Sequence, residues 1–286
     1  MNPINTNESL KNKDSEVNWN VLWKEAVEKL PKKTSSKSWD EIAPQFDEWM
    51  KKDDYPHELV SKIKIEDGDT VLDIGCGNGV ITLPLAAKAS SVTALDISRK
   101  MLDILQAKAA AQNLSNIKVI NKGIEDVEAR EIGYHDVVVA SRSLNGIADI
   151  QPELEKINKI ARKYVYITLW GVDNRKFESE MAELLGRESY QHPDYTIVLN
   201  LLHEMGIHAN VEPMKSNTRN FYATIEDALD RIKWRIGDLN EEEKAIITEH
   251  LEKSLTKNPD GSLSFSRSNS KWVLIWWEKS KVNNEN

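Results

Sequence analysis

Short apolar runs alternate with helix-forming segments from residue 70 onward, and this alternation constrains the fold more than any other feature. The segments between the first apolar runs have helical periodicity, and they predict helices at Val80–Lys88, Arg99–Gln112 and Pro152–Arg162. Strands that alternate with helices build right-handed βαβ units around a parallel sheet. We therefore predict an α/β fold whose strands are Thr70–Ile74, Ser91–Leu95, Ile117–Ile120, Asp136–Ala140, Tyr164–Leu169, Ile207–Val211 and Lys271–Trp277.

Two further parts accompany the alternating region. Residues 1–60 form a predicted N-terminal helical cap, which Pro31–Ser38 divides and in which Ser38 and Glu41 have capping-box spacing. Residues 61–286 form the main domain, with a helical insertion at 220–256. The cap is too short to bury its own core, so we expect a lid that is mobile without ligand. Its aromatic anchors are Trp19, Trp23, Trp39, Phe46 and Trp49.

Composition narrows the classes of function. The 286 residues suit one large domain, and a net charge of −8 offers no general attraction for nucleic-acid phosphates. A single cysteine, Cys76, excludes an internal disulfide and favours a reducing compartment. The N-terminus has no basic region followed by an apolar run, and no apolar stretch approaches the roughly 18 residues of a membrane span. We expect a soluble, cytoplasmic protein without a bound metal.

The strongest chemical signal is the sequence Val-Leu-Asp-Ile-Gly-Cys-Gly-Asn-Gly at residues 71–79. A predicted strand enters Gly-x-Gly-x-Gly and a helix follows, so the backbone can approach a ligand closely. Asp96 ends the next strand, 17 positions after Gly79 and near the spacing of about 20 at which a carboxylate binds a ribose diol. Asp73 precedes the loop and would repel a pyrophosphate, whereas it suits a cationic ammonium. These features favour S-adenosylmethionine over a nicotinamide or flavin dinucleotide.

The chain resembles the class I S-adenosylmethionine-dependent methyltransferases. The matching motifs are the loop at 71–79, Ala-Leu-Asp-Ile-Ser at 94–98 with Lys100-Met101-Leu102, and Asn-Lys-Gly-Ile-Glu-Asp-Val at 121–127. The resemblance implies a Rossmann-like seven-stranded sheet in the order 3-2-1-4-5-7-6, with six parallel strands and one antiparallel strand. It also implies direct displacement at the sulfonium methyl group, with S-adenosylhomocysteine as product.

The resemblance also implies the cofactor contacts. Gly75 and Gly77 would line the methionine part, with Asp73 and Cys76 in the same motif, and Asp96 would bind both ribose hydroxyls. The remaining contacts would be Ile97 on adenine, Ile124 and Glu125 (or Asp126) at the edge of adenine, and Ser141 near the methionine tail. For Cys76, packing within the loop is favoured over a role as a nucleophile.

The acceptor side is less constrained. Trp39, Phe46, His57 and Arg142 are predicted to line a substrate pocket, and the aromatic rings could hold an apolar or cationic acceptor. Strand polarity leaves His57 and His192 as possible bases, but methyl transfer to a good nucleophile needs no strong base. We therefore assign no catalytic residue.

The layout favours the branch of the family that acts on small molecules. The segment after the fourth predicted strand, Ala140–Asn145, lacks the Asn/Asp-Pro-Pro-aromatic motif of amino-methylating nucleic-acid enzymes. Two alternatives stay open: an RNA or protein methyltransferase, and a regulatory protein that binds the cofactor without turnover. The sequence names neither the acceptor nor an oligomeric state.

Overall fold

A seven-stranded sheet forms the centre of the molecule. The computed structural model describes residues 17–30, 38–51, 53–173, 176–188, 192–215, 221–265 and 271–279. The strand order is β3-β2-β1-β4-β5-β10-β6, and β10 runs antiparallel to β5 and β6. This confirms the predicted order, with β10 as the seventh strand of the sheet. The strands are β1 (Thr70–Ile74), β2 (Ser91–Leu95), β3 (Ile117–Ile120), β4 (His135–Ser141), β5 (Ala161–Trp170), β6 (Asn210–Pro213) and β10 (Trp272–Glu278).

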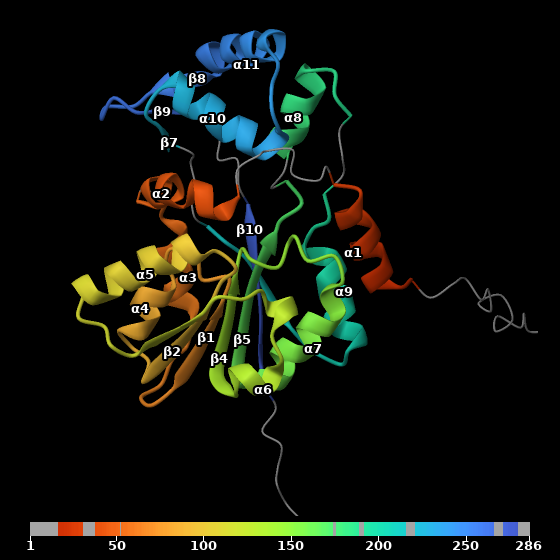
Figure 1. The fold of residues 1–286 in the computed structure, drawn as a ribbon. Coiled ribbons are helices and arrows are strands. Elements are labelled where there is room, and N and C mark those ends of the chain that lie inside the picture. Colours follow the sequence, from red (N-terminus) through yellow and green to blue (C-terminus); the bar gives the residue numbers. More distant parts are fainter. Residues whose placement is uncertain are drawn as a thin grey trace, which may run out of the picture.

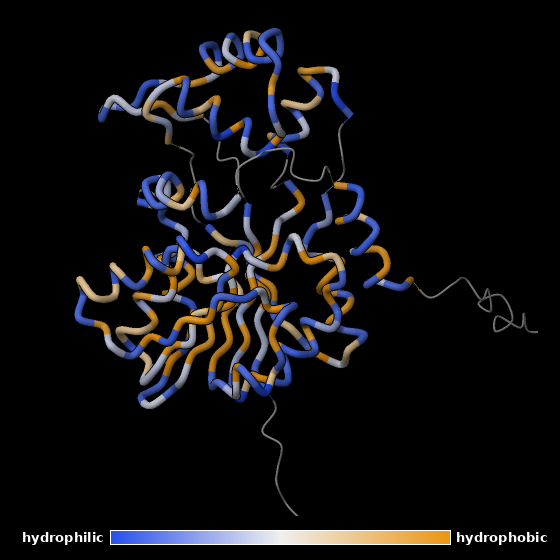
Figure 2. Tube along the Cα trace, in the orientation of Figure 1, coloured by the Kyte–Doolittle hydropathy of each residue, from blue (hydrophilic) through white to orange (hydrophobic). Residues whose placement is uncertain are grey.

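Helices cover both faces of this sheet (Figure 1). Successive residues of a strand point to opposite faces, and accordingly Val71 belongs to the same core cluster as Leu59 of α3, while Leu72 belongs to the cluster that contains Leu154 of α7. Figure 2 shows the resulting apolar strands between the helical layers. The helices around the sheet are α1 (Trp19–Glu28), α2 (Trp39–Met50), α3 (Tyr55–Lys62), α4 (Thr82–Ala86), α5 (Arg99–Ala111), α6 (Ala129–Ile132), α7 (Ile150–Ile160) and α9 (Tyr195–Glu204), together with the 3-10 helix η1 (Ile124–Asp126).

The N-terminal segment divides between two places. Helix α1 packs against α7 and α9 on one flank, where Trp23 is fully buried and its Nε1 donates to the carbonyl of Ile147 at 2.8 Å. Helix α2 lies on the other side, above α5 and below the upper helices (Figure 1). The residues 31–37 between them lie outside the described part of the chain, as do residues 1–16.

The upper part of the molecule is a small subdomain with its own core. Ala228, Leu229 and Ile232 of α10 pack with Ile247 and Leu251 of α11. A three-stranded sheet, β7-β9-β8, completes the subdomain. The insertion predicted at 220–256 therefore continues to residue 265, and its strands were missed because each has only two or three residues. The elements are α8 (Lys176–Leu184), β7 (Phe221–Tyr222), α10 (Ile225–Ile236), α11 (Glu241–Ser254), β8 (Leu255–Lys257) and β9 (Leu263–Phe265).

Two predicted boundaries were wrong by a few residues. Strand β5 begins at Ala161, because Ala161 pairs with His135 across a register irregularity in β4. Strand β6 covers Asn210–Pro213 rather than Ile207–Val211, because its partner β10 determines which residues pair. Among the described helices, none has the length and apolar character of a membrane span.

Candidate active site

The glycines of the loop after β1 have two different roles, packing and access for a ligand, which the sequence cannot distinguish. Gly75, Gly77 and Gly79 have φ angles of +68°, +52° and +84°, which favour glycine. A Cβ on Gly75 would lie 2.3 Å from Cβ of Ser143, and one on Gly79 would lie 2.2 Å from Leu105. A Cβ on Gly77 would meet no atom within 4 Å. Gly75 and Gly79 are therefore required by packing, whereas Gly77 leaves its backbone open to a ligand.

Asp96 ties this loop to the start of α5. Its carboxylate accepts from the N–H of Gly77 at 2.7 Å and from the N–H of Ser98 at 2.8 Å. Burial raises the pKa of Asp96, and these N–H groups oppose that shift. The next side chain, Ile97, is apolar and 61% exposed, which suits contact with a flat ring. A Cβ on Gly123 would lie 3.3 Å from Cγ2 of Ile97, so the loops after β2 and β3 meet here.

The predicted adenine-edge residues differ in exposure. Ile124 is buried in the core, and its carbonyl accepts from Lys156 Nζ at 2.7 Å. Glu125 is an exposed residue on η1, but its carboxyl group is partly shielded from water; this shielding, followed by the negative charges of Glu153 and Asp126, raises its pKa. Any contact of a ligand with Ile124 would therefore involve the backbone.

Asp73 lies beneath the loop and is fully buried. Thr82 Oγ1 donates to its Oδ2 at 2.6 Å, whereas Oδ1 is buried with no hydrogen-bond partner in the described part of the chain. Burial raises the pKa of Asp73 to about 7. The carboxyl is thus poised to ionise when a cation approaches. Burial also raises the pKa of the Cys76 thiol, which packs with Leu83 and indicates a structural side chain.

A hydroxyl network surrounds the end of β4. Ser141 Oγ lies 3.0 Å from the hydroxyl of Tyr55, which lies 2.5 Å from Thr168 Oγ1 at the end of β5. The N–H of Arg142 donates to the same Thr168 oxygen at 2.9 Å, and Ser143 Oγ donates to the carbonyl of Ile74 at 2.7 Å. The carboxyl ends of β1, β4 and β5 are thereby joined. Sequence reasoning missed Tyr55 and Thr168, since neither belongs to a motif.

Helix α2 connects the loop to the upper subdomain. Asp40 Oδ1 accepts from Ser98 Oγ at 2.6 Å, and Asp47 Oδ1 accepts from Asn78 Nδ2 at 2.6 Å and from Lys108 Nζ. Capping-box spacing at Ser38 and the aromatic anchors predicted a helix here, but they predict none of these contacts.

The aromatic side chains of α2 contact α10. Trp39 lies 5.1 Å from the ring of Trp234 and 5.9 Å from Phe46, and Arg231 lies 4.4 Å from the ring of Trp49. Of the predicted pocket residues, Trp39 is therefore in this contact, and Phe46 packs beside it against Trp39 and Trp49. His57, the third, is exposed on α3.

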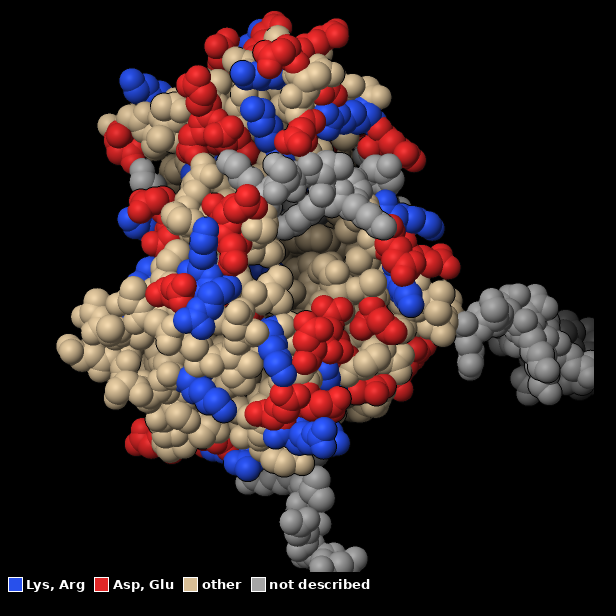
Figure 3. Space-filling view, in the orientation of Figure 1, with Lys and Arg blue, Asp and Glu red and all other residues tan. Residues whose placement is uncertain are grey.

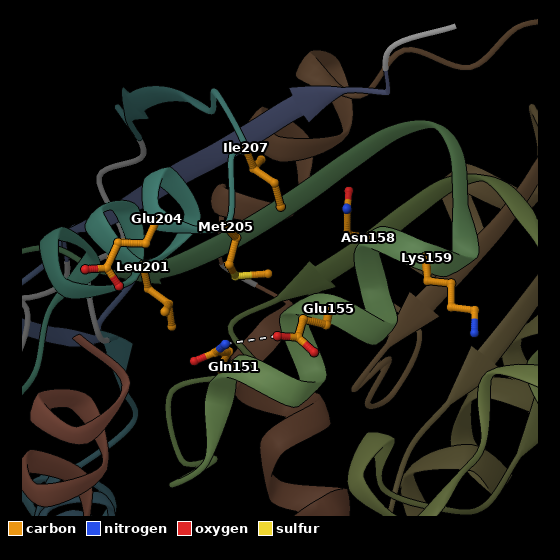
Figure 4. A pocket seen from close by; sticks show the side chains of 8 residues that line it. All are labelled: Gln151, Glu155, Asn158, Lys159, Leu201, Glu204, Met205 and Ile207. Carbon is orange, nitrogen blue, oxygen red and sulfur yellow. Dashed lines mark hydrogen bonds between the residues drawn. The ribbon is translucent and has the colours of Figure 1, made fainter. Parts of the chain in front are cut away.

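Hollows occur in different parts of the described molecule, and two of them lie near the central sheet. Figure 3 shows one between the sheet and the upper subdomain, with mostly uncharged walls and acidic groups near its rim. A separate groove of about 370 Å³ lies between α7 and α9 (Figure 4). Its residues Asn158 and Lys159 come just before β5, so it lies toward the amino end of that strand. Ligands of open α/β sheets bind at the carboxyl ends of strands, which makes the first hollow the candidate site.

A profile of the methyltransferase domain family matches residues 65–244, more than half of the chain. The chain belongs to the class I S-adenosylmethionine-dependent methyltransferases. The matched region contains the glycine loop, Asp96 and the network around Ser141. It ends in α11, so the family match includes part of the upper subdomain.

Several relatives of this methyltransferase share its sequence or fold. It is 32% identical over 248 residues to an uncharacterized protein of Haemophilus influenzae, a match that covers 85% of this chain and 90% of that protein. It is 26% identical over 161 residues to a demethylmenaquinone methyltransferase of Lactobacillus johnsonii, covering 50% of this chain and 62% of the relative.

A solved structure has a similar fold. It is the magnesium protoporphyrin IX methyltransferase of Synechocystis PCC 6803 with bound SAH, which has a TM-score of 0.53 and 15% identity. The alignment covers 84% of this chain and 97% of that one. At this identity the likeness concerns the fold alone.

Proposed function

We propose that this methyltransferase transfers a methyl group from S-adenosylmethionine to a small-molecule acceptor in the hollow above β1, β4 and β5. The observation that carries the proposal is the pairing of Asp96 with the open backbone of Gly77 at 2.7 Å. A carboxylate beside an unobstructed glycine offers acceptors for a ribose and space for the chain attached to it.

The residues of the site fit this cofactor. Asp96 would bind both ribose hydroxyls, Ile97 would pack on adenine, and Glu125 would accept from the adenine amino group. Gly75 and Gly77 would line the methionine part, whose ammonium would face Asp73, and Ser141 would lie near its tail. The unpartnered Oδ1 of Asp73 supports a cationic ligand, since a buried acceptor without a donor costs about 1–3 kcal/mol.

The chemistry needs little from the protein beyond position. When bound, S-adenosylmethionine would supply an electrophilic methyl group: the acceptor's nucleophile forms a bond to the methyl carbon, the C–S bond breaks with its electron pair going to sulfur, and S-adenosylhomocysteine is the leaving group. The chain's own residues would align the acceptor and exclude water, and alignment alone accounts for a large part of such rate enhancements. The thiol of Cys76 is buried with a raised pKa and takes no part.

Two observations favour a small acceptor. The net charge is −8, and acidic groups gather near the rim of the hollow, which disfavours RNA. The relative named demethylmenaquinone methyltransferase acts, by its name, on a small molecule.

The test combines binding with transfer. Calorimetry should show binding of S-adenosylmethionine and S-adenosylhomocysteine at about micromolar Kd, and much weaker binding of NAD. Methyl-labelled S-adenosylmethionine is then incubated with the protein and a cell extract separated into metabolite, RNA and protein fractions. Label in the metabolite fraction supports the proposal, and Asp96→Ala is the control. Label in RNA or protein would identify a different acceptor class, and NAD binding of equal strength would refute the cofactor.

A further inference from the structure

Arg142 adopts a backbone conformation that arginine rarely occupies. Its φ angle is +57°, in the left-handed region, and such a conformation costs about 1–3 kcal/mol. Its N–H donates to Thr168 Oγ1 at 2.9 Å, which helps to hold this conformation. A strained residue at the carboxyl end of a central strand indicates a functional constraint.

The guanidinium of Arg142 is enclosed and short of hydrogen-bond acceptors. It stacks on the ring of Tyr55, with Cζ 3.3 Å from the ring centroid, and only 20% of the side chain is exposed. Of its five N–H donors, Nη2 donates to Asp53 Oδ2 at 2.9 Å. The hydroxyl of Tyr55 also lies within reach of the guanidinium, and a hydrogen bond from Arg142 lowers the pKa of that hydroxyl. Nε is buried with no partner among the described residues.

The nearby charges leave these donors available. Asp53 balances the charge of Arg142, but it uses one guanidinium nitrogen, and its other oxygen accepts from the N–H of Tyr55 at 3.1 Å. Burial raises the pKa of Tyr55, so the hydroxyl beneath the guanidinium stays neutral. What the site lacks is therefore a planar acceptor of several N–H bonds, and a carboxylate has that geometry.

Arg142 also lies where methyl transfer would occur. Its neighbour Ser143 touches the glycine loop, since the Cβ of Ser143 is 2.3 Å from the position of a Cβ on Gly75. Its other neighbour, Ser141, shares the Tyr55 network. A group bound to Arg142 would therefore lie beside the methionine end of the cofactor.

We infer that Arg142 binds a carboxylate at the methyl-transfer centre. The inference rests on the proposed function and adds the chemistry of one ligand group to it. Two molecules can bring a carboxylate to this place: the cofactor, through its amino-acid end, or an acidic acceptor.

The experiment distinguishes these two sources. Arg142→Gln and Arg142→Lys are compared with the wild type in calorimetric titrations of S-adenosylhomocysteine and of its decarboxylated analogue. Benzoate and benzamide are then titrated into protein saturated with S-adenosylhomocysteine. Arg99→Gln is the matched control, because Arg99 is exposed and pairs with Asp103 on the outside of α5 at 2.9 Å.

Each outcome bears on the inference. If the cofactor brings the carboxylate, Arg142→Gln should weaken S-adenosylhomocysteine binding by about tenfold or more and leave the analogue unchanged. If the acceptor brings it, wild-type protein should prefer benzoate to benzamide and Arg142→Gln should abolish that preference. Arg142→Lys should recover only part of either effect, because lysine cannot bind a carboxylate bidentately.

In Arg142→Gln the carboxylate of Asp53 loses its ion-pair partner. The double variant Asp53→Asn/Arg142→Gln controls for this unpaired charge, and it should show the same losses of binding as Arg142→Gln. Two results together overturn the inference: Arg142→Gln is folded and binds S-adenosylhomocysteine with wild-type affinity, and the wild-type protein shows no preference for benzoate over benzamide. A wild-type protein that binds no S-adenosylhomocysteine would instead overturn the proposed function.

Discussion

Removal of the Asp96 carboxylate is expected to weaken cofactor binding while the fold survives. Each oxygen of this carboxylate already accepts one backbone N–H, from Gly77 at 2.7 Å and from Ser98 at 2.8 Å. A carboxylate offers about four acceptor positions, so two stay available for the ribose hydroxyls. Asp96→Ala therefore removes two contacts within the protein and two proposed contacts to the ligand.

The magnitude follows from the charge of the acceptor. A hydrogen bond to a charged group contributes about 1.5–3 kcal/mol, so two ribose contacts contribute at most about 3–6 kcal/mol. Asp96 is partly exposed, and water replaces some of this loss. A net loss of at least about 1.4 kcal/mol, or tenfold in Kd, is the expected lower bound. Loss of the two backbone contacts in Asp96→Ala should make the loop less stable by a similar amount.

Calorimetric titration of S-adenosylhomocysteine measures this loss, and circular dichroism establishes that the variant is folded. Asp103→Ala is the control: Asp103 lies on α5, is 54% exposed and, among the described residues, forms its ion pair with Arg99, so its loss should leave the affinity unchanged. Wild-type affinity in folded Asp96→Ala would refute the reasoning, and Asp96 would then serve only to join the loop to α5.

Three further expectations concern the loop, its buried acid and the N-terminal helices. Gly75→Ala should lower the thermal midpoint more than Gly77→Ala, since both have a positive φ but only the Cβ at residue 75 meets another side chain. Gly77→Ala should weaken S-adenosylhomocysteine binding more than its smaller loss of stability explains; the opposite ranking would contradict the two roles. Because folding raises the pKa of Asp73 to about 7 from 3.8, its contribution to stability is present at low pH and is lost as the pH rises from about 4 to 7. Over the upper part of that range S-adenosylhomocysteine should bind more tightly. Urea titrations and calorimetry of Asp73→Asn should show both pH dependences reduced, with a remainder in stability from Asp96, whose pKa burial also raises. In hydrogen exchange, S-adenosylhomocysteine should protect α2, whereas α1 should be protected without it because Trp23 is fully buried; Trp23→Ala should cost about 3–5 kcal/mol of unfolding free energy. Full protection of α2 without ligand would contradict the prediction of a mobile lid and would make α2 a fixed part of the structure.

Much of the main domain could be predicted because its signals are local. A buried strand such as β1 shows as an apolar run, and a turn that needs positive φ shows as glycine. The position of Asp96 after β2 then places a carboxylate beside the loop, since the carboxyl ends of neighbouring parallel strands share one edge. The order of the strands followed from the family resemblance, and the structure confirms it.

Other parts of the site could not be predicted, because they depend on contacts between distant residues. Tyr55 bonds to Thr168 across 113 positions, and Asp47 bonds to Asn78 from a helix that the sequence placed only in a cap. Neither pair has a spacing or composition that signals contact.

The sequence by itself determined the α/β architecture, the glycine loop and its acidic partner, because hydrophobic period and backbone freedom are properties of single segments. Only the tertiary structure decided that Trp23 is buried on a flank while α2 lies above the loop, and that Gly75 serves packing while Gly77 faces open space. It also decided that the guanidinium of Arg142 is enclosed beside Tyr55 with donors to spare. These features depend on which surfaces meet when the helices close over the sheet, and burial and hydrogen-bond satisfaction are determined only at that stage.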